Sequence, residues 1–182
     1  DLGGSRKSAY TNDFKGNFTI TVANFEGEAP GDIALNLEQP FTISSEQYDG
    51  VLCINVLEHI FNYQNVINET RRILKPGGRA IFAVPFLIQV HPSPHDHWRF
   101  TAETLERLFT EAGFTEINIE SIGTGVFGAQ VQMMYNVLHF SLLRRLANTF
   151  AKFMDKLVSK VFKKDTFSKQ FYSLGYVVTA RK

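Results

Sequence analysis

The sequence predicts a doubly wound α/β fold around a parallel sheet. Two apolar segments, YDGVLCIN (48–55) and RAIFAVPF (79–86), have the uninterrupted hydrophobic centres of strands that are buried on both faces. A segment with helical spacing separates them, and helical and strand patterns continue to alternate along the chain. Strands joined by helical crossovers form such sheets, which bind ligands beyond the carboxyl ends of their strands.

The first half of the chain provides the segments for one side of this sheet. FTITVANF (18–25) alternates and is β-branched, which predicts a strand, and GDIAL (31–35) is a shorter candidate. After the strand at 48–55, apolar residues with helical spacing predict a helix over 63–74, with Asn62 as its N-cap. We expect Lys75-Pro76-Gly77-Gly78 to end this helix and turn the chain.

The second half begins with a loop. Pro92 and Pro94 exclude regular structure from LIQVHPSPHDHWRF (87–100). Thr101 is the expected cap of a helix that ends at Gly113. The remaining predicted elements are a strand at 116–122, a helical stretch at 129–162 and a closing strand at 174–182.

Composition limits the possible classes of protein. A chain of 182 residues with 44% hydrophobic and 20% charged residues fits one globular domain. A net charge of +1 creates no field that would attract nucleic acid. Cys53 is the only cysteine, lies in an apolar run and is expected to be buried; the lack of an intrachain disulfide favours a cytoplasmic location. We see no signal peptide and no apolar stretch of the ~20 residues that a membrane span needs.

Three blocks of sequence carry a resemblance to a known family. YDGVLCINVLEHIFNYQNVINETRRILKPGGRAIFAVPF (48–86) resembles the class I S-adenosylmethionine-dependent methyltransferases, in particular their type 11 methyltransferase-domain group. HPSPHDHWRFTAETLERLFTEAGF (91–114) resembles a loop and helix found in a subset of that group, and GYVVTARK (175–182) resembles its antiparallel last strand. The resemblance implies one Rossmann-like domain over 1–182, with S-adenosylmethionine as cofactor. A helical insertion over 129–165 would precede the last strand, and the first strand is expected to lie before Asp1.

The same resemblance assigns the start of the chain to the cofactor. Asp1-Leu2-Gly3-Gly4-Ser5 occupies the place of the family's acidic residue and Gly-x-Gly-x-Gly motif. Glycine lets the backbone approach a ligand, and backbone N–H groups at a helix start can hold its carboxylate. Ser5 replaces the second glycine and Lys7 the third, so the motif is degraded. A plain glycine turn is the alternative interpretation.

Further cofactor contacts follow at the other strand ends. Asn24 stands where the family has an acid that binds the ribose hydroxyls; Glu26 could substitute for it, and a simple turn residue is the alternative. Asn36 and Leu37 match the pair that holds the adenine. The resemblance also places Asn55 and Val56 beside the methionine moiety.

The loop after the strand at 79–86 is the candidate acceptor site. Methyl transfer often needs a base, and His91 or His95 could take the proton of the acceptor, with Asp96 orienting the imidazole. Arg99 could bind an anionic group of the substrate. The alternative is that Asp96 and Arg99 pair and hold the loop, while Trp98 and Phe100 fill the core.

Histidine side chains of this chain could also bind a metal ion or fix a turn. His91, His95 and His97 with Asp96 could bind zinc or iron, but the prolines break the helix that would align them, so no metal site is predicted. Glu58 and His59, which mark the family, are expected to fix their turn by hydrogen bonds.

The segment SLLRRLANTFAKFMDKLVSKVFKK (141–164) is amphipathic. It places apolar residues on one face and many lysines on the other; the apolar ones are Leu142, Leu143, Leu146, Phe150, Phe153, Leu157 and Val161. Such a helix usually covers an apolar surface of its own domain, here as a lid over the pocket. Peripheral membrane contact through 142–164 and a dimer seam are the alternatives.

Together these observations predict methyl transfer from S-adenosylmethionine to a small-molecule acceptor by direct in-line displacement, without a metal. No nucleic-acid partner is expected. The alternative is a non-catalytic methyltransferase-like binding or assembly module, which the departures at Ser5, Lys7, Asn24 and Asn36 would support. The acceptor itself is set by the shape of the pocket and does not follow from the fold.

Overall fold

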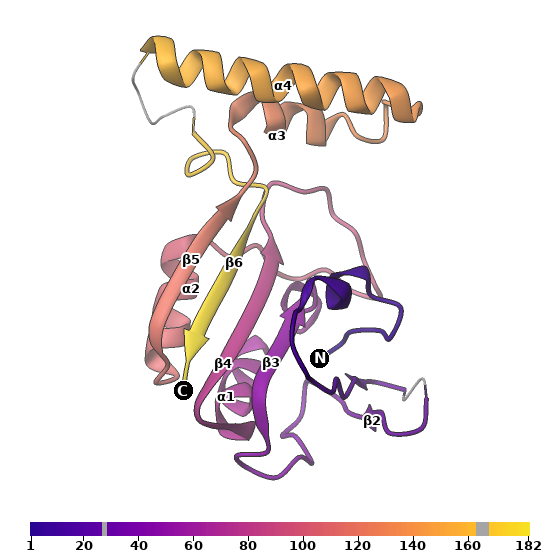
Figure 1. Cartoon of the computed structure of the whole chain (residues 1–182), viewed down its shortest axis with the longest axis vertical. Coiled ribbons are helices and arrows are strands. Elements are labelled where there is room, and N and C mark those ends of the chain that lie inside the picture. Colours follow the sequence, from indigo (N-terminus) through magenta and orange to yellow (C-terminus); the bar gives the residue numbers. More distant parts are fainter. Residues whose placement is uncertain (27–28, 163–167) are drawn as a thin grey trace.

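The computed structural model describes residues 1–26, 29–162 and 168–182. Its main sheet has the order β3-β4-β6-β5, in which β3 and β4 are parallel and β6 is antiparallel to both of its neighbours. The strands are β3 (Tyr48–Ile54), β4 (Leu74–Pro85), β5 (Thr115–Ile122) and β6 (Gly175–Arg181). The predicted α/β class and its antiparallel last strand are thereby confirmed (Figure 1).

The start of the chain extends this sheet beyond β3. The two short strands β1 (Ala23–Asn24) and β2 (Ile33–Ala34) pair in parallel, and Leu2 forms a parallel bridge to Ala23. The Leu2 amide also donates to the carbonyl oxygen of Leu52 in β3, at 2.8 Å. Backbone hydrogen bonds therefore connect neighbouring segments in the order β2, β1, residues 1–3, β3, β4, β6 and β5.

The predicted strand at 18–25 is mostly absent. Only Ala23 and Asn24 pair with β2, because residues 14–21 leave the plane of the sheet and pass over the face of β3 and β4. A 3-10 helix, η1 (Ala9–Asp13), precedes this segment. The predicted end of the helix at Lys75 is also different, since residues 75–78 already belong to β4 and cause a jump in its register against β3.

Two helices cover one face of the sheet: α1 (Tyr63–Ile73) and α2 (Ala102–Glu111). Thr101 caps α2 as predicted, because its side chain accepts a hydrogen bond from the Thr104 amide. Asn62 precedes α1 but makes no side-chain cap; its amide group instead donates to the carbonyl oxygen of Glu38. Gly113 follows α2 with a φ of 85°, a left-handed conformation that glycine adopts without strain.

The core lies between these helices and the sheet. Phe82 of β4 and Phe109 of α2 are both fully buried and meet edge to face, with ring centroids 5.0 Å apart. Leu105 of α2 is buried with them. Cys53 is fully buried as predicted, and this burial raises the pKa of its thiol, so it is an unreactive part of the core.

The helical stretch predicted at 129–162 consists of two helices instead of one. These are α3 (Val126–Met133) and α4 (Ser141–Phe162), and they pack against each other beyond one end of the sheet (Figure 1). Asp155 of α4 is almost fully buried and joins the pair: its carboxylate accepts hydrogen bonds from the Thr124 hydroxyl (2.7 Å) and the amides of Phe127 (2.9 Å) and Gly128 (3.0 Å).

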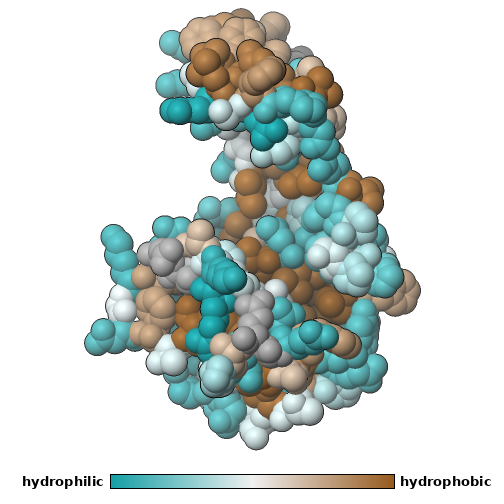
Figure 2. Space-filling view, turned by 90° about the vertical axis from the view of Figure 1, so that its right-hand side faces the viewer, coloured by the Kyte–Doolittle hydropathy of each residue, from teal (hydrophilic) through white to brown (hydrophobic). Residues whose placement is uncertain are grey.

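The apolar face of α4 does not pack against the rest of the domain. Its seven predicted apolar residues are between 41% (Leu157) and 66% (Leu142) exposed, and Figure 2 shows hydrophobic side chains on the surface at this end of the molecule. The expected burial fails because α4 packs on α3 through its other side, where Ala151 and Asp155 lie. No helix among the described residues is long and apolar enough to span a membrane.

A charged clamp fixes the segment that follows β2. Glu69 of α1 accepts hydrogen bonds from the Phe41 amide (2.7 Å) and from the Arg72 guanidinium (2.6 and 2.9 Å). Arg72 in turn donates to the carbonyl oxygens of Phe41 and Ile43, at 3.0 and 2.7 Å. The Arg72 guanidinium therefore holds the pKa of the Glu69 carboxyl below its usual value.

Replacing Glu69 with glutamine is expected to flatten the acid limb of the stability curve. Because the pKa of Glu69 is lowered in the folded state, its contribution is present above the unfolded value of about 4.3 and is lost as the pH falls through the folded value. At pH 7 the variant should lose about 1–3 kcal/mol of unfolding free energy. Urea unfolding of both proteins between pH 7 and pH 3 measures this, and a difference that does not shrink with falling pH would contradict it.

Candidate functional site

The loops that follow the parallel strands meet at one edge of the sheet. Asn24 ends β1, Asn55 follows β3, and the first residues of the chain lie between these strands. The Asn24 side chain donates to the carbonyl oxygen of Gly4, at 3.3 Å. Gly3 lies against Val56, which follows β3. The structure therefore brings the glycine loop together with two of the strand ends that the sequence singles out.

The glycine loop has no room for side chains. Gly3 has a φ of 67°, and a Cβ atom there would lie 2.7 Å from both γ-carbons of Val56. A Cβ atom on Gly4 would overlap the carboxylate of Asp1. Glycine is thus required by the backbone at Gly3, whereas at Gly4 a side chain would displace the Asp1 carboxylate; the loop presents a bare main chain at the edge of the sheet.

Asp1 carries an unused hydrogen-bond acceptor in this loop. Its Oδ2 atom accepts a hydrogen bond from the Tyr10 hydroxyl, at 2.7 Å. Its Oδ1 atom is buried and has no hydrogen-bond partner among the described residues. An unpaired buried acceptor costs free energy, so this oxygen fits a site that a ligand donor completes.

The two asparagines form local hydrogen bonds. Besides its bond to Gly4, Asn24 accepts at Oδ1 from the Phe25 amide, at 2.8 Å. Asn36 is exposed, and its Oδ1 atom accepts from the Glu38 amide, at 2.9 Å. Each of these turn-forming bonds occupies one of the two lone pairs of a side-chain oxygen that the family resemblance assigns to ribose or adenine.

The other candidate cofactor residues differ in exposure. Leu37 is buried in the core, whereas Asn55 is exposed and has a φ of 53°. Val56 is half-buried beside Gly3. The Ser5 hydroxyl accepts a hydrogen bond from the Lys7 amide, at 3.3 Å, so Ser5 stabilises the turn that follows the glycines.

The loop after β4 is held by an ion pair. Arg99 binds both oxygens of Asp96, at 2.5 and 2.7 Å, and Asp96 also accepts from the His91 amide, at 2.8 Å. The Arg99 guanidinium holds the pKa of the Asp96 carboxyl well below its usual range. Arg99 also donates to the carbonyl oxygens of Trp98 (2.8 Å) and Gln89 (3.3 Å). This pairing corresponds to the alternative stated from the sequence, in which Asp96 and Arg99 pair and hold the loop.

Aromatic packing holds the end of the same loop. Phe100 is buried in the core and Trp98 packs against it. The ring of Tyr63, at the start of α1, meets both of them edge to face at 5.1–5.2 Å. The loop is therefore anchored at its C-terminal end, and Asp96 and Arg99 extend the anchored part toward His91.

Glu58 lies at the centre of the site, and its position was not predicted. It belongs to the short helix η2 (Leu57–His59), is fully buried, and neither of its carboxylate oxygens has a hydrogen-bond partner among the described residues. Burial raises the pKa of this carboxyl group. Its Oε1 atom lies 3.6 Å from Nε2 of His59 and 3.7 Å from Nε2 of His91. Glu58 and His59 do make hydrogen bonds at this turn, because the Glu58 carbonyl accepts from the His97 and Trp98 amides and Nδ1 of His59 lies 2.5 Å from the His95 carbonyl oxygen; the Glu58 carboxylate takes no part in them.

His95 and His97 point elsewhere. Their rings contact each other at 5.4 Å, and His95 is exposed. The four residues His91, His95, His97 and Asp96 do not form a common ligand set among the described residues. The sequence does contain a signal for the Glu58 cluster. Glu58 and His59 follow β3, and His91 follows the neighbouring strand β4.

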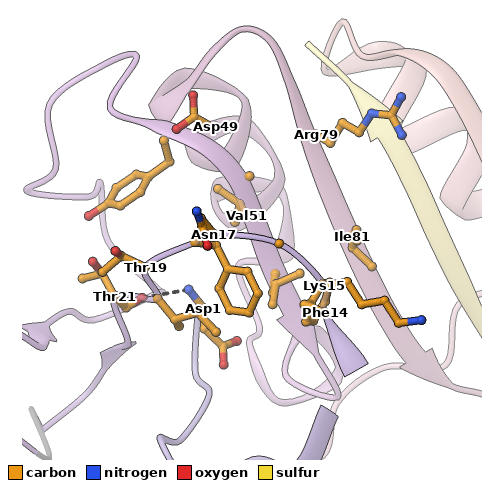
Figure 3. A pocket seen from close by; sticks show the side chains of 16 residues that line it. Asp1, Phe14, Lys15, Asn17, Thr19, Thr21, Asp49, Val51, Arg79 and Ile81 are labelled. Atoms are coloured by element: carbon orange, nitrogen blue, oxygen red, sulfur yellow. Dashed lines mark hydrogen bonds between the residues drawn. The ribbon is translucent and has the colours of Figure 1, made fainter. Parts of the chain in front are cut away.

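A cleft of about 930 Å³ lies away from these loops. Residues 14–21 form one wall and the face of β3 and β4 forms the other, with Val51, Arg79 and Ile81 in its lining (Figure 3). The strand residues in its lining are 48–52 of β3 and Arg79 and Ile81 of β4, which all lie before the carboxyl ends of these strands. A doubly wound sheet binds ligands at the carboxyl ends, so we place the candidate site in the loops.

The chain matches one family model and, over shorter stretches, several curated proteins. A family model described as a methyltransferase domain matches residues 8–119. An uncharacterized protein of Methanocaldococcus jannaschii is 42% identical over 67 residues, and the match covers 29% of each chain. A ubiquinone biosynthesis O-methyltransferase of Klebsiella pneumoniae is 42% identical over 38 residues, which cover 21% of this chain and 16% of the relative. The chain spans less than a third of the length of these curated relatives.

Solved structures share the fold at low sequence identity. A chain in the complex of the Haloferax volcanii Trm112 methyltransferase activator with a methyltransferase has a TM-score of 0.58 and 14% identity; the match covers 99% of this chain and 79% of that one. A SAM-dependent methyltransferase from Archaeoglobus fulgidus has a TM-score of 0.53 and 12% identity, covering 89% and 75%. The Burkholderia thailandensis 1,6-didemethyltoxoflavin-N1-methyltransferase has a TM-score of 0.50 and 16% identity, covering 89% and 60%.

Proposed function

The chain belongs to the methyltransferase-domain family, and on this premise we propose that it transfers a methyl group from S-adenosylmethionine to a small molecule. Bound S-adenosylmethionine supplies a methyl group on a positively charged sulfur. In a direct in-line displacement, the bond from this carbon to sulfur breaks as its bond to an acceptor oxygen or nitrogen forms. S-adenosylhomocysteine then leaves, and the proton of the acceptor passes to a base on the protein.

The observation that carries this proposal is the glycine loop with its unused acceptor. Asp1 offers a buried oxygen that has no partner among the described residues, and Gly4 keeps the space beside its carboxylate free of a side chain. A polar ligand with donor groups fits this arrangement. The residues proposed to hold the cofactor are Asp1, Gly3, Ser5, Asn24, Asn36, Leu37, Asn55 and Val56.

The acceptor side of the site is proposed to be the loop after β4. His91 and His95 are the side chains that can take the proton of the acceptor. Asp96 and Arg99 use their charges on each other, so we assign them to positioning His91, not to binding a substrate anion. A small-molecule acceptor is supported by the Burkholderia neighbour, whose structure contains 1,6-didemethyltoxoflavin.

Calorimetry with S-adenosylhomocysteine tests the first half of the proposal. We expect saturable binding at one site, with methionine alone as the ligand control. Turnover is then measured as S-adenosylhomocysteine formed from S-adenosylmethionine in the presence of phenols, catechols and amines. The absence of S-adenosylhomocysteine binding at millimolar concentration would contradict the proposal, whereas binding without turnover on every acceptor would favour the non-catalytic alternative.

The partners of the protein are a separate proposal. The exposed apolar face of α4 supports contact with another surface, and its alternatives are peripheral membrane contact through 142–164 or a second protein. Residues 163 and 164 of that range lie outside the described residues. The Haloferax neighbour, which forms a complex with an activator protein, supports the protein alternative. A lid role for 129–165 and a cytoplasmic location stay predictions.

A further inference from the structure

Three side chains from two loops converge at the edge of the sheet. Glu58 and His59 follow β3, and His91 follows β4. One oxygen of Glu58 and one nitrogen from each imidazole all lie within 4.8 Å of one another. The two rings stand nearly perpendicular, at 83°, with centroids 5.2 Å apart. These residues form a compact cluster, of which the methyl transfer proposed above uses only His91.

Each converging atom has a lone pair in the neutral imidazole forms. Nδ1 of His59 lies 2.5 Å from the carbonyl oxygen of His95, and Nδ1 of His91 lies 3.1 Å from that of Gln89. A carbonyl oxygen can only accept, so both Nδ1 atoms must carry the proton in these bonds. The Nε2 atoms that face Glu58 are then acceptors, and so is the ionised carboxylate.

This convergence of acceptors needs a proton or a metal ion between them. Glu58 is fully buried without a hydrogen bond from any described residue, which is costly for a charged carboxylate. Arg99 does not supply the cation directly, because its guanidinium is bound to Asp96. A proton on the carboxyl group would remove the charge of Glu58, whereas additional protons on the imidazoles or a metal ion would compensate it; of these, only a metal ion also uses the lone pairs of both Nε2 atoms.

We infer that Glu58, His59 and His91 bind a divalent transition-metal ion. Two imidazoles and one carboxylate suit zinc, iron and their neighbours, and three protein ligands leave coordination positions open. Metal-ligating histidines usually donate their other ring N–H to a carbonyl or carboxylate, as both rings do here. Binding the ion would satisfy the buried carboxylate and both Nε2 atoms at once.

The cluster is accessible and lies close to the glycine loop. The side chain of His91 is 37% exposed, so an ion can enter from that side, whereas His59 is only 13% exposed. Val56, which contacts Gly3, lies two residues before Glu58. The cluster therefore follows the same strand end as the residue that lies against the glycine loop. With Nε2 of His91 on the metal, His95 is the imidazole that remains to take a proton.

A titration of the metal-free protein with Co²⁺ tests this site without any methyl donor. We expect visible d–d absorption that saturates at one equivalent, and competition by Zn²⁺. Glu58→Gln and His91→Ala should each weaken binding at least tenfold, whereas His139→Ala, a histidine between α3 and α4, should leave it unchanged. Circular dichroism and thermal unfolding check that the variants fold; His91 is half-exposed, so its variant tests the site even if Glu58→Gln unfolds.

Two results would overturn the inference. The first is no saturable Co²⁺ spectrum in the wild-type protein, as expected if protons on Glu58 or on the imidazoles satisfy the cluster. The second is wild-type affinity in both Glu58→Gln and His91→Ala, as ligation by the exposed His95 and His97 would give. Because no methyl donor is present, either result leaves the S-adenosylhomocysteine experiment unaffected, and the two proposals can fail separately.

Discussion

Replacing Asp155 with alanine is expected to separate α3 from α4. The N-terminus of α3 follows Gly125, which has no side chain to cap it, and the amides of Phe127 and Gly128 point to the Asp155 carboxylate. Removing this carboxylate leaves buried donors unpaired, and we expect the local stability of the helix pair to fall by about 3 kcal/mol. Hydrogen exchange at the amides of Phe127 and Gly128 measures this loss as faster exchange.

Two further variants separate the causes. Asp155→Asn keeps one acceptor oxygen but turns an NH₂ group toward donors, so it should exchange almost as fast as Asp155→Ala. Lys156→Ala removes a charge from the neighbouring exposed position and should leave exchange unchanged. Unchanged protection of both amides in Asp155→Ala would show that the cap does not hold the helices together.

Replacing Gly3 with alanine is expected to abolish most cofactor binding. The left-handed backbone at Gly3 costs a non-glycine residue about 1–2 kcal/mol, and the added Cβ atom must also displace Val56. Both effects move the loop that carries Asp1. Calorimetry should show S-adenosylhomocysteine affinity at least tenfold weaker, together with a lower melting temperature.

The control uses a glycine with space around it. A Cβ atom on Gly50 would come no closer than 3.7 Å to the carbonyl oxygen of Arg79, so Gly50→Ala should bind like the wild-type protein. Combining Gly3→Ala with Val56→Ala removes the overlap of side chains but keeps the strained φ at residue 3. The affinity that the double variant regains is therefore due to the overlap, and the loss that remains is due to the backbone strain. Wild-type affinity in Gly3→Ala would show that this loop does not hold the cofactor.

The buried elements of the fold could be predicted because each is fixed by its own sequence. β3, β4 and β6 are short runs of apolar residues, and α1 and α2 have a single apolar stripe. The segment at 18–25 has the same alternation as a strand, yet only Ala23 and Asn24 find a partner, in the short strand β2. Local pattern indicates what a segment can form, whereas pairing depends on a partner elsewhere in the chain.

The segment at 129–162 shows that burial is harder to predict from sequence than helix formation. Its apolar face predicts burial, but no described residues cover that face, and α4 packs through Ala151 and Asp155. Amphipathic spacing shows that a helix has an apolar face without showing what covers that face.

The sequence predicts which loops form the candidate site, but it does not predict which side chains in those loops contact each other. The rule that ligands bind at the carboxyl ends of strands selects the segments containing Asp1, Asn55 and His91. It cannot show that the Glu58 carboxylate faces two imidazoles, because that depends on how the loops after β3 and β4 bend toward each other. Side-chain convergence between loops is a tertiary property.

The position of β6 also determines when this domain can fold during synthesis. β6 lies between β4 and β5, so the pairs Ala80–Ala180 and Ser121–Tyr176 form only after residues 175–181 have left the ribosome. Until then β4 and β5 each present an unpaired edge to other chains. Completion of the sheet therefore waits for residues 175–181, and a nascent chain stalled before Gly175 would keep both edges exposed to aggregation.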